Sequence, residues 1–211
     1  LIIALALLTF FFGRKDKKGF DSRTISYAAV CIAMSFALSY LKLWEMPYGG
    51  SVTIASLLPL MIYSYMFGVR KGVFAGAIYG LLQVIQDPWI LHPAQLLLDY
   101  PIAFAGIGLA GMFRSVRALD KTPQVKFLLG ALIGSAIRYL SHLFSGVFAF
   151  GQFAADYGFE SDWLYSLTYN TFVFADIAIV IVVGVVVFSS KAFMNVVDRY
   201  NRPAKPAAAQ A

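Results

Sequence analysis

The chain has 211 residues and a mass of 23.2 kDa; 60% of the residues are hydrophobic and only 13% are charged, with a mean hydropathy of +0.72. Soluble domains usually carry about 25% charged and about 45–50% apolar residues, so ordinary soluble, disordered and nucleic-acid-binding proteins are excluded. In an apolar chain, the net charge of +6 indicates cationic loops at one membrane surface. The single cysteine, Cys31, excludes an intramolecular disulfide. The composition predicts an integral membrane protein.

Six apolar stretches meet or approach the length of a membrane span, which is about 20 residues at about 1.5 Å each. They run from Thr24 to Leu43, Thr53 to Gly68, Gly72 to Gln86, Pro93 to Phe113, Lys126 to Phe150 and Trp163 to Phe188. We therefore expect an all-α integral membrane protein with a six-helix bundle.

The organisation we expect has three parts: residues 1–23, 24–190 and 191–211. The first is the apolar stretch Leu1 to Phe12 followed by a basic linker. It is too short to span as written, and we interpret it as an extra or truncated helix rather than the remains of a signal sequence, because basic residues and not a small-residue cleavage site follow it. The second part is the six-helix membrane domain. The third is a cytoplasmic tail, which we expect to be disordered from Pro203 because it is low in complexity.

Lysine and arginine occupy every second connection between the expected spans. The basic connections carry Arg14, Lys15, Lys17, Lys18 and Arg23, then Arg70 and Lys71, then Arg114, Arg117, Lys121 and Lys126, and finally Lys191, Arg199, Arg202 and Lys205. The other three connections, residues 44–52, 87–92 and 151–162, contain acidic residues and no lysine or arginine. The positive-inside rule makes the basic loops and the C-terminus cytoplasmic.

Few ionisable side chains lie at membrane depth. A charge there has a high free-energy cost, so such side chains normally face the protein interior. Counting from the outer helix ends places Asp99, His142 and Asn170 at one level, about 9–12 Å deep. Arg138 and Asp176 lie deeper, at about 18–20 Å, and are expected to pair. A carboxylate below aromatic side chains suits an organic cation. The aromatic candidates are Trp44, Tyr48, Trp89, Tyr100, Phe150 and Tyr165.

Structural roles for these residues stay open at this point. Asp99 is equally suited to pair with Arg138 or to join two helices by a hydrogen bond, and a lone His142 is more often a core histidine with satisfied hydrogen bonds. Glycines spaced by four, at 72, 76 and 80 and at 130 and 134, favour close helix packing.

Several signatures of catalysis and energy conversion are absent from the sequence. It contains no GxxxxGK[ST] phosphate loop, no HExxH and no GxSxG, and it has only two histidines. The chain is therefore not expected to hydrolyse ATP, to be an enzyme, or to hold a metal or another cofactor.

Two outer motifs resemble a known family. They read WEMPYGGSVT at residues 44–53 and WILHPAQLLLDYP at residues 89–101, and further similarity covers RYLSH at 138–142 and YSLTYN at 165–170. Over about Arg23 to Phe188 the sequence resembles the thiamine-specific substrate-binding (S) component of energy-coupling factor (ECF) transporters.

The resemblance implies a multi-pass protein of a bacterial cell membrane that captures thiamine with high affinity from the outer face. It also implies three partners, namely a transmembrane coupling subunit and two cytoplasmic ATPases. The substrate-binding residues that it implies are Trp89, Asp99, Tyr100, His142, Phe150, Tyr165 and Asn170. Ala29 and Ala33 match the small-residue motif that contacts the coupling subunit. Well-known members carry Glu at the position of Asp99 and Trp at that of Phe150.

Three alternatives remain. The first is an S component for another aromatic vitamin or a pyrimidine precursor. The second is a solitary secondary carrier in which Asp99 and His142 relay protons. The third, a membrane enzyme, lacks a recognisable catalytic arrangement.

Overall fold

The computed structural model describes residues 1–14, 19–47, 50–86 and 88–201. Several residues used in the sequence predictions lie outside these ranges. They are Lys15, Lys17, Lys18, Tyr48, Asp87 and the tail from Arg202.

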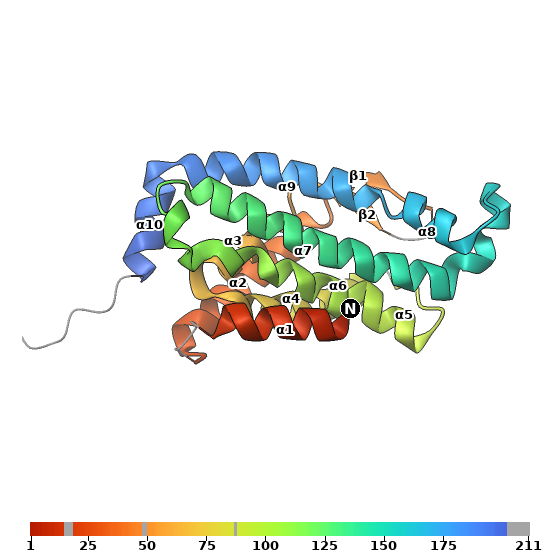
Figure 1. Ribbon diagram of the computed structural model, residues 1–211, viewed down its shortest axis with the longest axis horizontal. Coiled ribbons are helices and arrows are strands. Elements are labelled where there is room, and N and C mark those ends of the chain that lie inside the picture. The colour runs from red at the N-terminus through yellow and green to blue at the C-terminus, as the bar shows by residue number, and fades with distance from the viewer. Residues whose placement is uncertain (15–18, 48–49, 87, 202–211) are drawn as a thin grey trace, which may run out of the picture.

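The chain folds into a bundle of helices that run side by side along one long axis (Figure 1). Its first half contains α1 (Ile2–Gly13), α2 (Ser22–Leu38), β1 (Lys42–Glu45), β2 (Ser51–Thr53), α3 (Leu58–Phe67) and α4 (Val69–Gln86). A central helical run follows, made of α5 (Pro93–Leu97), the π-helical η1 (Leu98–Ile102), α6 (Ala103–Ile107) and the 3-10 helices η2 (Gly108–Ser115) and η3 (Arg117–Leu119). The rest comprises α7 (Pro123–Ser145), the π-helical η4 (Gly146–Phe150), the short 3-10 helices η5 (Gly151–Phe153) and η6 (Ala155–Tyr157), α8 (Asp162–Tyr169), α9 (Phe172–Ser189) and α10 (Lys191–Asn201).

Each of the six predicted spans is mainly helical, but the all-α prediction is wrong for residues 42–45 and 51–53. These two strands form an antiparallel pair, called the hairpin, in which Lys42 pairs with Thr53 and Trp44 with Val52. The hairpin follows from the need to satisfy backbone N–H and C=O groups in a segment that leaves the bundle. It lies at the end of the bundle that also carries α8, which we call the hairpin end (Figure 1). The opposite end, called the basic end, carries α10 and the end of α1 (Figure 1). Arg14 follows α1, Arg70 lies beside Gly13, Arg114 donates to the Met66 carbonyl, and Arg117 begins η3.

Three helical runs of the described chain are long and apolar enough to cross a membrane. They are Pro93–Ser115, Pro123–Phe153 and Asp162–Ser189. Helices α1, α2 and α3 are apolar but shorter. The last three predicted spans therefore coincide with helical runs of sufficient length and apolarity, whereas the apolar helices α1, α2 and α3 of the first half are shorter.

Glycine faces hold the central run between α4 and α7, as the spacing of the glycines predicts. Gly76 and Gly80 on α4 approach the backbone of Phe104 and Tyr100, and Gly130 on α7 approaches that of Ala110. A side chain at any of these positions would overlap the neighbouring backbone. This close packing fixes the central run, and with it the position of Asp99.

The long helices become irregular toward the hairpin end. The central run widens into a π-helix at η1, where Pro101 has no N–H to continue the α-helical ladder. A second π-helix, η4, extends α7, and a break at Asn170–Thr171 separates α8 from α9. Such interruptions often occur at functional sites.

The close approach at Gly76 predicts a large cost for a single methyl group. We expect Gly76→Ala to reduce the stability by about 1–3 kcal/mol through overpacking. The matched variant Gly19→Ala should have little effect, because the space around Gly19 is open. Thermal denaturation of both variants in detergent measures the difference, and equal melting temperatures would contradict this account of the packing.

Candidate substrate-binding site

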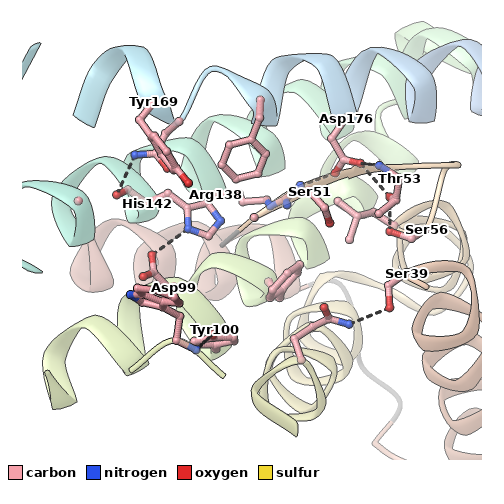
Figure 2. A pocket seen from close by; sticks show the side chains of 18 of the residues that line it. Ser39, Ser51, Thr53, Ser56, Asp99, Tyr100, Arg138, His142, Tyr169 and Asp176 are labelled. Atoms are coloured by element: carbon pink, nitrogen blue, oxygen red, sulfur yellow. Dashed lines mark hydrogen bonds and ion pairs between the residues drawn. The ribbon is translucent and has the colours of Figure 1, made fainter. Parts of the chain in front are cut away.

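A cavity opens within the hairpin end, between the central run, α4, α7, the α8–α9 break and the hairpin. Its volume is about 120 Å³, counted as space open to the centre of a water molecule. Figure 2 shows Asp99, Tyr100 and His142 on one side of it and Ser39, Ser51, Thr53 and Ser56 on the other. A water molecule needs about 10–15 Å³ on the same measure, so the cavity is large enough for an organic molecule.

Asp99 on η1 is held by three side chains. Its Oδ2 accepts hydrogen bonds from Gln95 Nε2 at 2.8 Å and from Ser145 Oγ at 2.7 Å. Its Oδ1 lies 2.9 Å from Nδ1 of His142. The two oxygens of a carboxylate offer about four acceptor positions, so one position on Oδ1 remains for a ligand. The side chain is 16% exposed, which leaves it within reach of the cavity.

The contact with Asp99 also orients His142. An ionised carboxylate only accepts hydrogen bonds, so Nδ1 of a neutral histidine must donate and Nε2 is then an acceptor. Nε2 is buried and has no hydrogen-bond partner among the described residues. It is therefore a second group available to a bound molecule.

Gln95 connects the loop above the cavity to Asp99. Its Nε2 donates to the Trp89 carbonyl at 2.8 Å as well as to Asp99, and its Oε1 accepts from the Leu91 backbone N–H at 3.1 Å. The Trp89 N–H in turn donates to the hydroxyl of Tyr100 at 3.2 Å. Gln95 is only 2% exposed, and it fixes the loop and the carboxylate relative to each other.

Tyr165 and Asn170 reach the same cavity although they are five residues apart. On a regular helix they would point in different directions, but α8 ends at Tyr169 and Asn170 lies in the break. The Nδ2 of Asn170 donates to the Ser166 carbonyl at 2.9 Å and to the His142 carbonyl at 3.3 Å. The bond to His142 connects the break to α7, next to the aromatic side chains of Phe150 and Tyr165 in the cavity wall.

Arg138 and Asp176 form the predicted ion pair, with Nη1 and Oδ2 2.6 Å apart. The other oxygen of Asp176 accepts from the backbone N–H and the hydroxyl of Thr53, at 3.0 and 2.9 Å. A second cation of the cavity wall, Lys42, pairs with Glu45 at 2.8 Å. Each of the two cations therefore has an acidic partner. Among the charged residues that the structure describes in the cavity wall, Asp99 is the one without an ion pair to Lys or Arg. The site therefore favours a positively charged ligand.

All seven predicted binding residues line this one cavity: Trp89, Asp99, Tyr100, His142, Phe150, Tyr165 and Asn170. Trp44, an expected aromatic of the mouth, lies instead on a separate groove together with Met46 and Tyr157. Trp44 is 67% exposed, because it projects from the strand β1 away from the cavity. In the described chain no three His, Cys, Asp or Glu side chains converge to hold a metal ion.

The sequence prediction missed Gln95, Ser145 and Phe172. Two of them carried a signal, since Gln95 lies four residues before Asp99 and Ser145 three residues after His142, on the same helix faces. Phe172 carried none, because it reaches the cavity only through the break that precedes α9.

The predicted docking residues Ala29 and Ala33 are exposed on α2 and do not line this cavity. Helix α1 packs on α4 and η2 and leaves both alanines uncovered. Both alanines are therefore open on the outside of the bundle, beside the exposed side chains of Val30 and Met34.

Comparison with known proteins identifies the family. Residues 25–196 match the family model described as "Thiamine transporter protein (Thia_YuaJ)". The chain belongs to this family. Its members are transporters and not enzymes, which agrees with the absence of catalytic motifs.

Individual relatives agree with the family match. Thiamine transporter ThiT of Bacillus subtilis (strain 168) is 44% identical over 133 residues, covering 60% of this chain and 68% of the relative. ThiT of Lacticaseibacillus paracasei is 29% identical over 175 residues, covering 74% of this chain and 83% of the relative. A solved structure of ThiT from Listeria monocytogenes superposes with a TM-score of 0.65 at 24% identity, over 85% of this chain and 97% of the other. This last match establishes a membrane helical bundle as the fold.

The ion pair of Arg138 and Asp176 predicts a large effect on stability. Both residues are at least 95% buried. Asp176→Ala therefore leaves the Arg138 cation buried without its partner and removes the acceptor of two hydrogen bonds from Thr53. We expect a loss of about 3–5 kcal/mol, visible as a lower melting temperature. Asp156→Ala, at an exposed carboxylate, serves as the control, and an equal melting temperature for the two variants would refute the assigned role.

Proposed function

We propose that this thiamine transporter works as the substrate-capturing S component of an ATP-driven ECF importer and binds thiamine at high affinity in the cavity beneath the hairpin. The observation that carries the proposal is the Asp99 carboxylate, anchored by Gln95, His142 and Ser145 and open to the cavity. Thiamine carries a fixed positive charge on one ring and a hydrogen-bonding pyrimidine on the other. Asp99 offsets that charge, and the aromatic walls stack on the rings.

The polar groups around Asp99 suit the directional part of recognition. The acceptor Nε2 of His142 and the amide of Asn170 lie on the same cavity wall as Tyr165. Asp99 is one methylene shorter than the Glu of well-known members, and three donors hold it in a fixed position. Phe150 takes the place of Trp and offers a weaker cation–π face.

The orientation we propose follows from charge. The basic end, with Arg14, Arg70, Arg114 and Arg117, faces the cytoplasm by the positive-inside rule. The hairpin end then faces outward, and substrate enters from outside the cell. Six membrane passages, formed by α2, α3, α4, the central run, α7 with η4, and α8 with α9, are consistent with basic segments at one end only.

The chain contains no ATP-binding loop, so the ATP-driven transport that we propose requires partners. We propose that the exposed Ala29 and Ala33 on α2 contact a transmembrane coupling subunit, which joins the chain to two cytoplasmic ATPases. Small side chains allow two membrane helices to approach closely, and this surface lies outside the cavity, so that binding and docking use separate residues.

Removal of the charge on Asp99 tests the substrate assignment. We expect Asp99→Asn to fold normally and to weaken thiamine binding by more than about a hundredfold, because a buried cation loses its counter-charge. Calorimetric titration of the purified chain in detergent measures the affinity. Asp156→Asn should bind like the unaltered protein. Unchanged affinity in Asp99→Asn, or no binding of thiamine to the unaltered chain, would overturn the proposal.

Bulky side chains on α2 test the docking surface. We expect Ala29→Trp or Ala33→Trp to abolish thiamine uptake by cells while thiamine binding to the purified chain stays unchanged. Val182→Trp, at a 65% exposed position of α9, should leave both intact. Loss of binding together with uptake would instead indicate misfolding. Uptake by the lone chain in liposomes without ATP would support a solitary carrier and contradict the need for partners.

A further inference from the structure

Phe172 is the first residue of α9 and lines the cavity at 7% exposure. Its ring centroid lies 5.9 Å from that of His142, with an angle of 47° between the planes. The guanidinium carbon of Arg138 lies 5.9 Å from the same ring centroid. The ring therefore stands between the histidine that contacts Asp99 and the ion pair on the deeper side of the cavity.

The hairpin accommodates this ring by having no side chain at Gly50. A Cβ placed on Gly50 would lie 2.6 Å from Cζ of Phe172 and 2.9 Å from its Cε1. Gly50 also has a φ of +86°, which disfavours other residues. The end of the hairpin thus rests directly on the outer edge of the ring and keeps it at the cavity wall.

We propose that Phe172 is a further substrate-contacting residue, whose ring stacks against an aromatic ring of the bound substrate, and that Gly50 is the positioning residue that holds it there. The proposal rests on the proposed function of thiamine capture. It adds an inner aromatic face to the walls formed by Phe150 and Tyr165.

The charges around Phe172 support this role. Arg138 is neutralised by Asp176 at 2.6 Å, so the cation beside the ring does not repel a positively charged substrate as an unpaired one would. A phenyl ring attracts both an aromatic ring, through dispersion and its quadrupole, and an organic cation at its face.

The test compares two phenylalanines on one helix. Phe172→Leu retains an apolar side chain but removes the ring, and we expect the dissociation constant for thiamine to rise about 3- to 10-fold. Phe174→Leu is the matched control, because Phe174 is 51% exposed and packs on Tyr139 away from the cavity. Calorimetric titration of the full chains in detergent gives the affinities, and thermal denaturation verifies that both variants are folded.

A second pair of variants tests whether Gly50 in the hairpin positions the Phe172 ring. We expect Gly50→Ala to displace Phe172 and to weaken thiamine binding to a similar degree. Gly158→Ala controls for backbone strain, because Gly158 also has a positive φ, +73°, but has no neighbouring atoms within 4 Å of the added methyl group. This pair decides the question if Phe172→Leu does not fold.

The outcomes separate this inference from the proposed function. If the unaltered chain binds thiamine and Phe172→Leu binds it within about twofold, Phe172 does not contact the substrate. Equal losses in Phe172→Leu and Phe174→Leu, or in Gly50→Ala and Gly158→Ala, would also overturn the assignment. Failure of the unaltered chain to bind thiamine refutes the function itself.

Discussion

The anchoring of one carboxylate, Asp99, is the interaction on which the site depends. A carboxylate at membrane depth is costly unless it is hydrogen-bonded or paired, and here donors from two helical runs meet it. Gln95 reaches it from the preceding turn, and His142 and Ser145 from α7. The same bonds set the loop at Trp89 and the tautomer of His142. The position of the Asp99 charge, the position of the Trp89 loop and the hydrogen-bonding groups of His142 are thereby determined together.

The other buried charges are arranged so that they do not oppose that carboxylate. Arg138 lies on the same face of α7 as His142 and would repel a cation in the cavity. Asp176 cancels its charge and also accepts two hydrogen bonds from Thr53. One ion pair therefore preserves the negative character of the cavity and ties the hairpin to the bundle. A buried pair of this kind is weak evidence for stability, and its value here lies in placing the hairpin above the cavity.

The molecule has a closely packed, regular part and an irregular part at the hairpin end. Along most of their length α4, the central run and α7 meet through glycines, which permit backbone contact. Toward the hairpin end the central run and α7 widen at η1 and η4, and a break at Asn170–Thr171 separates α8 from α9. The rigid part supports the site, and the irregular part turns Asp99, Phe150, Asn170 and Phe172 toward one cavity.

Composition and periodicity alone determined the membrane class, the helical stretches, the alternation of basic loops and the short list of buried ionisable residues. Those properties depend on the cost of burying charge and on the length of a span, which act locally along the chain. The pairing of Arg138 with Asp176 was also predictable from depth. The spacings of Gln95 from Asp99 and of Ser145 from His142 were visible in the sequence, and the structure shows both side chains bonded to Asp99. Only the tertiary structure decided that residues 42–45 and 51–53 pair as strands and that Phe172 meets Gly50. Each of these depends on contacts between segments far apart in the chain or on a local departure from the regular helix, and neither leaves a periodic signal in the sequence.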